Sequence, residues 1–308
     1  MPDVRQAQKF MRLMTEVEEN YLRDLRRLQR ETRRNLLDIL ERNGTSRLAV
    51  EQMQVEIKML KRRVEERARL ASKRVREVTK NYTAKQIEIA RRVMPVRVDV
   101  GQITAEAAQL AADGEQEIMT SAPAWIGQLA TSLQTGMSQM RLSQTPQQDA
   151  IARLLSEDIV DGRASAWHSS VNAAELEERR NIWQYAIGLT VLYLTGVNKQ
   201  SDEVQFQKQA IATIDENTTE CCLKVHGQIQ PFDEPFHLTG TPRFADYLQN
   251  PPFHWNCRTS VALYNEAFEE FGIPTSEMVD AAQAELEARA KTGKRVPIYP
   301  SHATARRK

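Results

Sequence analysis

Several residue types are scarce in this sequence, and their scarcity excludes several classes of protein. Three cysteines, two of them adjacent at Cys221 and Cys222, do not supply the disulfide framework of a small secreted domain. Twelve glycines and twelve prolines among 308 residues are too few for a collagen-like or low-complexity chain. Aromatic residues make up only 6%, but a hydrophobic share of 41% and a near-neutral total charge argue against wholesale disorder.

Long apolar segments are also missing. The N-terminal residues Met1–Met11 are polar and continue into a charged helical pattern, unlike the basic, apolar and small-residue order of a signal peptide. The longest apolar stretch, Ala186–Val197, is shorter than the roughly 20 residues that cross a bilayer. We therefore expect a soluble protein made in a reducing cytoplasm, with no membrane partner.

The net charge of +1 conceals an uneven distribution. Residues 1–95 contain 24 Lys and Arg against 14 Asp and Glu, residues 96–290 contain 12 against 27, and residues 291–308 contain six and none. The chain is basic at both ends and acidic in the middle. Such a distribution indicates contact with a polyanion or assembly by complementary charge, although a solvated helix face and a loose tail would give the same counts.

Residues 1–95 are predicted to form a basic hairpin of two long helices. The break falls at residues 43–46, where Gly44 can end one helix and Thr45 or Ser46 can cap the next, and Pro95 is expected to end the second. In each arm, nine residues span 29 positions in eight steps, which is the period of a straight amphipathic helix. The two series are Phe10, Met14, Val17, Tyr21, Leu25, Leu28, Thr32, Leu36 and Ile39, then Met53, Ile57, Leu60, Val64, Ala68, Ala71, Val75, Val78 and Tyr82.

Residues 96–205 are predicted to form an acidic helical region. The expected helices are 102–119, 123–140, 146–158 and 172–196, separated by loops that contain Pro123, Pro146 and Asp161-Gly162. The bulky residues expected in the core of this region are Trp125, Trp167, Trp183 and Tyr185.

Residues 206–265 are predicted to form a small α+β Cys/His module, and residues 266–308 a C-terminal helix followed by a basic, disordered tail. Gln228–Phe232 and Thr259–Tyr264 are typical of strands, and Thr275–Ala290 of an amphipathic helix. The expected fold class is mainly α, with a long N-terminal hairpin, a helical middle and this small module near the C-terminus.

The module contains two pairs of metal-ligand residue types. Cys222 and His226 are four residues apart, and His254 and Cys257 are three apart, about 30 residues further along. Two such pairs could place four donors around one zinc ion and so pin a module that is too small to be held by burial alone. His226 is the first choice for the fourth ligand, with His237 or water as alternatives.

The competing interpretation of these residues is structural. Cys222 and Cys257 would then be small buried apolar residues, and His254 would fix the turn that follows Pro251-Pro252. Cys221 is taken as incidental, because two adjacent residues do not easily share one interior.

A catalytic Cys257–His254 dyad is disfavoured, since such a histidine normally comes from elsewhere in the fold. Phosphate-binding, dinucleotide-binding and hydrolase motifs are absent from the sequence, so no catalytic residue and no enzymatic activity are expected.

The order of these residues resembles the phage Mu F-like domain of minor head, or head morphogenesis, proteins of tailed bacteriophages. The family pattern has an Asp, a Cys or His seven residues later, a Gly after five more, and a terminal P-P-x-H-x-N-C-R-C block. Asp215, Cys222 and Gly227 fall at these offsets, and the terminal block is filled by His254, Asn256, Cys257 and Arg258. Thr259 stands where the family often has a second Cys. The motif match covers about residues 206–265.

The resemblance implies a non-enzymatic role in capsid assembly, in the virion and in the host cytoplasm during assembly. Its implied partners are the portal and other capsid or scaffold proteins, with double-stranded DNA as a further candidate and no small-molecule substrate. Two other functions stay open. The first is a zinc-dependent nuclease or toxin-like enzyme, and the second is a nucleic-acid-binding helical hairpin whose affinity depends strongly on salt.

Overall fold

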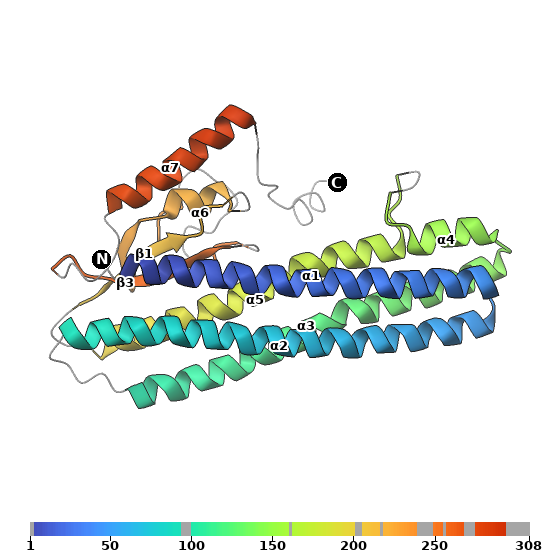
Figure 1. The fold of residues 1–308 in the computed structure, drawn as a ribbon, viewed down its shortest axis with the longest axis horizontal. Coiled ribbons are helices and arrows are strands. Elements are labelled where there is room, and N and C mark those ends of the chain that lie inside the picture. Colours follow the sequence, from blue (N-terminus) through green and yellow to red (C-terminus); the bar gives the residue numbers. More distant parts are fainter. Residues whose placement is uncertain are drawn as a thin grey trace. The chain divides into compact units, whose positions relative to one another are not determined.

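The computed structural model describes residues 3–93, 100–159, 162–200, 205–215, 218–238, 249–254, 257–267 and 275–293. The described part is mostly helical and carries one small sheet, which confirms the expected fold class (Figure 1). Its elements are α1 (Asp3–Asn43), α2 (Arg47–Val93), α3 (Val100–Leu142), α4 (Gln147–Leu155), α5 (Ala166–Lys199), β1 (Gln207–Ala212), α6 (Glu220–Val225), β2 (Ile229–Pro231), β3 (Thr259–Tyr264) and α7 (Thr275–Thr292). None of the described helices is long and apolar enough to span a membrane.

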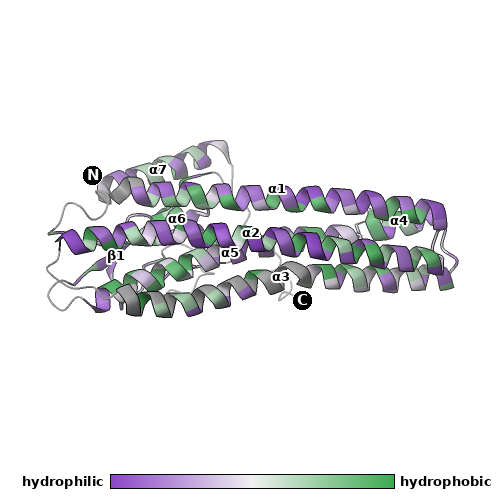
Figure 2. Cartoon of the chain, turned by 60° about the horizontal axis from the view of Figure 1, so that its bottom comes forward, coloured by the Kyte–Doolittle hydropathy of each residue, from purple (hydrophilic) through white to green (hydrophobic). Residues whose placement is uncertain are grey.

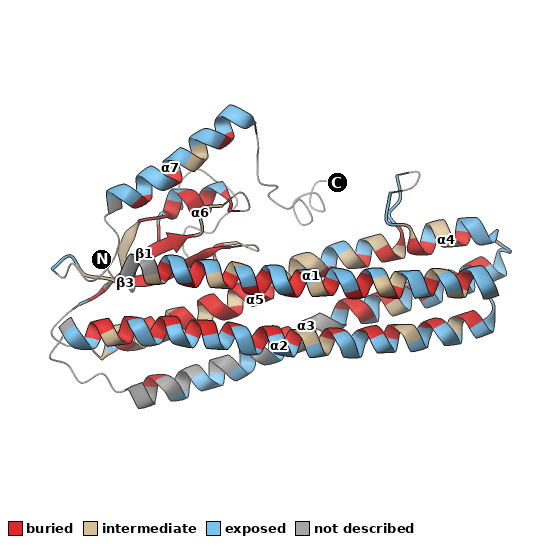
Figure 3. Ribbon diagram, in the orientation of Figure 1, coloured by how far each residue is buried: buried red, intermediate tan, exposed pale blue. Residues whose placement is uncertain are grey.

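The helices α1 and α2 form the predicted antiparallel hairpin (Figure 1). Gly44 has a φ of +57° at the turn, a backbone conformation that suits glycine at the end of a helix. The pairs Asn35–Glu56 and Glu31–Arg63 run in opposite directions along the two helices, as antiparallel packing requires. The predicted apolar series is buried throughout, except that Ile39 is half-buried and Leu40 takes its place (Figure 3). Pro95 lies outside the described residues.

The chain divides into two compact units. Unit 1 contains residues 1–15, 76–111 and 183–308, and unit 2 contains residues 16–75 and 112–182. Each of the helices α1, α2, α3 and α5 contributes one segment to each unit.

Unit 2 is a helical bundle in which polar contacts join α1 to α5. Arg26 donates hydrogen bonds to Glu175, Arg179 forms a 2.6 Å ion pair with the buried Glu18, and Tyr21 donates a 3.0 Å hydrogen bond to Glu178. Burial raises the pKa of Glu178 to about 8. The bundle interior therefore holds a carboxyl group that is protonated near neutral pH.

The structure corrects the predicted break in the middle region. Residues 102–119 and 123–140 were expected to be separate helices, but both belong to the single helix α3, which continues through Pro123. Proline destabilises the interior of a helix, because it has no backbone N–H to donate to the helical hydrogen bonds. The buried residues Ile118, Trp125 and Ile126 lie on both sides of it, and their packing in unit 2 outweighs this local cost. The breaks near Pro146 and Gly162 are confirmed, and all four predicted bulky core residues are buried.

The sheet in unit 1 has the order β2-β1-β3 and is antiparallel throughout. β3 has the predicted bounds, and β2 lies within the predicted strand 228–232. The central strand β1 was not predicted, because its sequence Gln-Lys-Gln-Ala-Ile-Ala begins with three polar residues. Lys208 is nevertheless fully buried there, since its Nζ donates to the carbonyl oxygens of Phe232 and Gln249.

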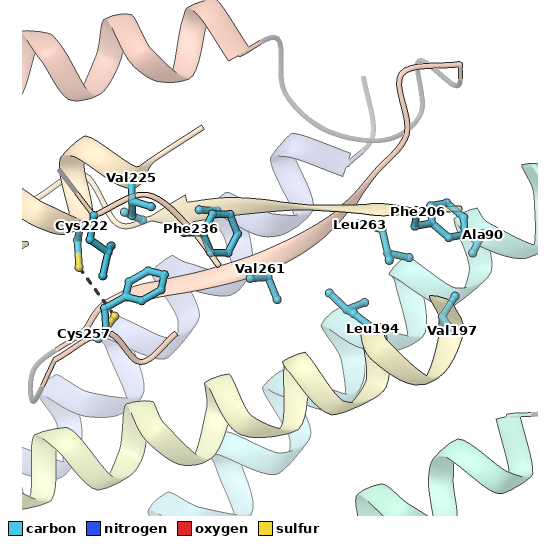
Figure 4. Packing of buried hydrophobic residues seen from close by; sticks show 14 of the residues in the cluster. Ala90, Leu194, Val197, Phe206, Cys222, Val225, Phe236, Cys257, Val261 and Leu263 are labelled. Carbon is cyan, nitrogen blue, oxygen red and sulfur yellow. Dashed lines mark hydrogen bonds between the residues drawn. The ribbon is translucent and has the colours of Figure 1, made fainter. Parts of the chain in front are cut away.

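The sheet module shares one hydrophobic core with the helix segments of unit 1. Ala90 of α2, Leu194 and Val197 of α5, and Phe206 and Leu263 of the module belong to the same buried cluster (Figure 4). Helix α2 also protects the edge strand β3, because Tyr82 donates a hydrogen bond to the carbonyl oxygen of Val261. Burial against these helix segments therefore contributes to anchoring the module.

The C-terminal helix α7 confirms the predicted helix 275–290 and extends it by two residues. It packs against α6. Most of the predicted tail, residues 294–308, lies outside the described residues.

Candidate functional site

Asp215 and Arg258, which come from the two motif blocks, form an ion pair. Arg258 Nη1 donates a 2.6 Å hydrogen bond to Asp215 Oδ2, and the Arg258 guanidinium lies over the Trp183 ring. The same carboxylate accepts a 3.0 Å hydrogen bond from the Thr218 hydroxyl through Oδ1. The turn that leads into α6 is thereby tied to the residue that precedes β3.

A third side chain, Arg289 of α7, completes this turn. Its guanidinium donates to the carbonyl oxygens of Thr218 and Asp215, at 2.6 and 2.7 Å, and to the carboxylate of Glu285. Sequence reasoning missed Arg289, because an arginine near the end of an amphipathic helix is common and its spacing gives no further signal. We call the contacts among Asp215, Thr218, Arg258 and Arg289 the Asp–Arg clasp.

His226 and Gly227 connect α6 to the sheet. Gly227 has a φ of +87°, which a side chain would strain, and its N–H donates a 2.9 Å hydrogen bond to the carbonyl oxygen of Ala210. His226 Nδ1 accepts a 2.8 Å hydrogen bond from the N–H of Ala212. Burial lowers the pKa of His226 to about 4, so the ring is neutral near pH 7. Both motif positions thus have a backbone-ordering role.

A cluster of thiols and one imidazole lies where α6 meets the segment before β3. Cys222 Sγ is 2.9 Å from His254 Nε2. It is 3.8 Å from Cys257 Sγ, and Figure 4 shows this contact between the two thiols. The Thr219 hydroxyl is 2.9 Å from His254 Nε2 and 3.0 Å from Cys221 Sγ. The structure therefore brings together three of the four residues predicted as zinc ligands.

The most compact group of donor atoms differs in membership from the predicted ligand set. The donor atoms of Cys221, Cys222 and His254 all lie within 4.8 Å of one another, and neither His226 nor Cys257 is part of this group. Cys221 and Cys222 are both buried, so the expectation that two adjacent residues do not easily share one interior was wrong. The physical reason is that α6 is covered on more than one side, by β1 and by α7, and adjacent residues can both face protein.

The cluster favours one negative charge at Cys222. Burial opposes ionisation of this thiol, but hydrogen bonds from Cys221 and Cys257 and the charge of the nearby His254 lower its pKa well below the usual value. The hydrogen bond to Cys222, assisted by burial, raises the pKa of Cys221, and burial followed by contact with Cys222 raises that of Cys257. The directions of these three pKa shifts favour a thiolate at Cys222 and neutral thiols at Cys221 and Cys257.

The donor set can be compared with the geometry of zinc. Two sulfurs that share a tetrahedral zinc ion lie about 3.8 Å apart, and a sulfur and an imidazole nitrogen lie about 3.5 Å apart. The separation of Cys222 and Cys257 is 3.8 Å and meets the first condition, whereas Cys222 and His254, at 2.9 Å, are at hydrogen-bond distance. A zinc ion held by Cys222 and His254 would need these two atoms to separate by about half an ångström. Cys257 is near Cys222 but is not in the compact group that Cys221, Cys222 and His254 form, so it would also have to approach His254.

Two further motif positions bear on the site. Thr259, which replaces a cysteine common in the family pattern, is fully buried, and its hydroxyl has no hydrogen-bond partner among the described residues. Asn256 lies outside the described residues.

The fold and the site define a mostly helical protein whose small sheet module is held by the Asp–Arg clasp and contains a buried thiol–imidazole cluster. Residues 128–262 match the family model described as Phage Mu protein F like protein. This match confirms the resemblance: the chain carries a Mu F-like region of the phage head morphogenesis family. Comparisons with curated proteins and with solved structures gave no match.

The family match reaches further upstream than the motif residues. It begins within α3, includes α4 and α5, and ends in β3, whereas the motif positions cover only about residues 206–265. The helical part of the match contains none of the motif residues, so the motif positions alone could not indicate that it belongs to the matched region. The family supports a role in phage head morphogenesis, as a virion protein that contacts other capsid proteins.

Proposed function

We propose that this chain is a minor head protein that acts in procapsid assembly in association with the portal, without enzymatic activity. The observation that carries the proposal is the match over residues 128–262, because that region includes the Asp215–Arg258 ion pair and the thiol–imidazole cluster. Apart from Arg289, the clasp and cluster residues described above come from the motif segments. A rigid, helix-supported module of this kind is suited to recognition by another protein.

The portal association is tested by comparing particles that assemble with and without the portal protein. We expect quantitative mass spectrometry to find the chain in few copies in portal-containing procapsids and to lose it from portal-free particles. Equal amounts in both would contradict portal association but keep the head role. Absence from procapsids and virions alike would contradict the head role itself.

A contact with packaged DNA is a second candidate, supported by the excess of ten positive charges in residues 1–95 and by the six cations in residues 291–308. Ion pairs with acids outside this segment reduce the first contribution, because Arg26 is paired with Glu175 and Arg33 with Glu157. We expect the full chain to bind duplex DNA with an affinity that falls steeply with salt. Removal of residues 294–308 should weaken that binding, and salt-independent or absent binding would contradict a DNA contact.

We also propose that Cys222, His254 and Cys257 bind one zinc ion, with Cys221 and His226 as the competing fourth ligands. The 3.8 Å separation of two thiols and the proximity of an imidazole support this proposal. When bound, zinc would hold α6 against the segment before β3 and stabilise the module. The alternative is a metal-free cluster that is held by its own hydrogen bonds.

Elemental analysis and thermal unfolding separate these two states of the cluster. Protein purified without added metal should contain about one zinc per chain, and a chelator should lower its melting temperature. Cys221→Ser and His226→Gln form a matched pair, since only the variant that removes the fourth ligand should lower zinc affinity markedly. Metal-free protein whose melting temperature is unchanged by chelator would rule zinc out.

A further inference from the structure

One face of α2 in unit 2 exposes a row of apolar side chains. Leu48, Val55, Met59 and Leu70 each leave 48–55% of their surface exposed. They are four of the eight large hydrophobic residues that are exposed in the described part of the chain. Figure 2 shows hydrophobic positions between the hydrophilic ones along this helix.

This apolar row lies opposite the core-facing side of α2. At 3.6 residues per turn, the four residues fall within an arc of about 60°. The buried residues from Met53 to Val75 centre on the other side of the helix. A helix that packs on a single core needs only one apolar face. Packing within unit 2 therefore does not account for the second one.

A row of unpaired cations borders the apolar row. Lys58, Arg62, Arg69 and Lys73 are exposed, and none of them forms an ion pair with another described residue. At the helical period they follow one another along one edge of the apolar row. Arg63 and Arg67 point the other way and are neutralised by Glu31 and Asp24 of α1. The face thus carries the apolar row, interrupted by the exposed Glu66, and is positively charged along one side.

We propose that this face, which we call the α2 outer face, is a docking surface for an acidic amphipathic helix of a protein partner. Such a helix would cover the apolar row with its own apolar stripe and would pair its carboxylates with the four cations. The row from Leu48 to Leu70 corresponds to about 33 Å, or six helical turns, of partner helix. The surface lies outside residues 128–262, so this partner site goes beyond the region that matches the family.

Other occupants satisfy the chemistry of the α2 outer face less well. A nucleic-acid backbone would neutralise the cations but leave the apolar row in water. A second α2 outer face would bring two rows of cations together, and the chain's own residues 291–308 contain six cations and no acid. Only a partner that is both acidic and apolar matches both rows.

The test is fluorescence anisotropy of the full-length chain with a labelled synthetic helix that carries a leucine stripe flanked by glutamates. We expect binding that weakens at least tenfold in the double variant Met59→Ser/Leu70→Ser, and also in Arg62→Gln/Arg69→Gln. The exposed Glu66 lies within the apolar row, so Glu66→Gln should tighten binding by removing a repulsive charge. Gln54→Ser, an exposed position on another side of α2, is the matched control and should change nothing.

A scrambled peptide of the same composition and a 30-base-pair DNA duplex distinguish the other occupants. Equal binding of the scrambled peptide would overturn the proposal, because charge alone would then suffice. Duplex binding that competes with the peptide and is insensitive to Met59→Ser/Leu70→Ser would assign the face to phosphate instead. The proposal would also be overturned if the wild-type chain self-associated and the Met59→Ser/Leu70→Ser variant did not. It would be overturned as well if the chain did not bind the acidic helix.

Discussion

The carboxylate of Asp215 accepts a 2.6 Å hydrogen bond from the guanidinium of Arg258, although the two residues are 43 positions apart. The Arg258 side chain is only 4% exposed and that of Asp215 is 28% exposed. The two sequence blocks that carry the family resemblance therefore meet in one ion pair. Its role is to join the end of β1 to the start of β3, which fixes the position of α6 and its cysteines.

Asp215→Asn is expected to destabilise the protein strongly. The substitution keeps the shape of the side chain but removes the negative charge that Asp215 places beside the buried guanidinium of Arg258, and breaking a buried ion pair typically costs about 3 kcal/mol. The free energy of unfolding from chemical denaturation measures this effect. Glu175→Gln is the control, because it breaks the ion pair with Arg26, whose side chain is 48% exposed. We expect the control to cost less than about 1 kcal/mol. If both variants lost the same free energy of unfolding, burial would not make the Asp215–Arg258 pair more stabilising than the exposed pair.

Arg289→Gln is expected to loosen the turn before α6 without unfolding the helical bundle of unit 2. The variant removes two charge-assisted hydrogen bonds to the carbonyl oxygens of Asp215 and Thr218. Hydrogen exchange should therefore become faster in α6 and α7. Lys291→Gln makes the same change of charge at an exposed position two residues later and should leave exchange in α6 unchanged. Faster exchange in both variants would point to the charge of α7 rather than to the clasp.

The helical periodicity of the sequence predicted most of the helical part of the fold correctly. The hairpin turn at Gly44 and the buried residues of α1 and α2 follow from a regular spacing that tertiary contacts reinforce. It failed where a polar residue is buried by a contact distant in sequence. Lys208 sits in the central strand because its Nζ reaches carbonyl oxygens 24 and 41 residues away, and no local pattern encodes those partners.

The candidate site was predictable to a similar extent. The spacing of Cys222, His254 and Cys257 indicated a shared location, and the structure places them together. Cys221 and Arg289 could not be identified in this way. Their roles depend on the packing of α7 against α6, which is a contact between segments about 60 residues apart.

Gly196→Ala is expected to destabilise unit 1, although alanine normally favours a helix. A Cβ atom at Gly196 would lie 2.9 Å from Cγ1 and 3.2 Å from Cγ2 of Ile103, and the β-branched isoleucine has little freedom to move away. We expect a loss of about 1–3 kcal/mol in the free energy of unfolding. Gly127→Ala is the matched control on α3, since nothing lies within 4 Å of its Cβ position. It should stabilise the protein by up to about 1 kcal/mol. A gain in both variants would mean that α5 and α3 are not closely packed at Gly196.

Glu178→Gln is expected to reduce the loss of stability at alkaline pH. Burial raises the pKa of Glu178 from an ordinary value of 4.5 to about 8 in the folded protein. Between these two pH values, the folded state holds a proton that the unfolded state has released. Stability therefore falls as pH rises through this window, by about 1.4 kcal/mol per pH unit for this single group. Glutamine keeps the shape and an acceptor for the Tyr21 hydroxyl but cannot ionise.

Melting temperatures between pH 5 and pH 8 measure this dependence on Glu178. Below about pH 6.5 the buried, neutral His226 contributes a slope of opposite sign, so the wild-type curve should fall with pH between about pH 6.5 and pH 8. Over that interval the Glu178→Gln curve should be flatter and lie above the wild-type curve at pH 8. Glu41→Gln, which changes an exposed carboxylate on α1, should leave the wild-type slope intact. Parallel curves for wild type and Glu178→Gln would mean that the carboxyl group keeps an ordinary pKa through contact with water. The polar contacts between α1 and α5 would then be hydrated, and the interior of unit 2 would not enforce protonation of Glu178.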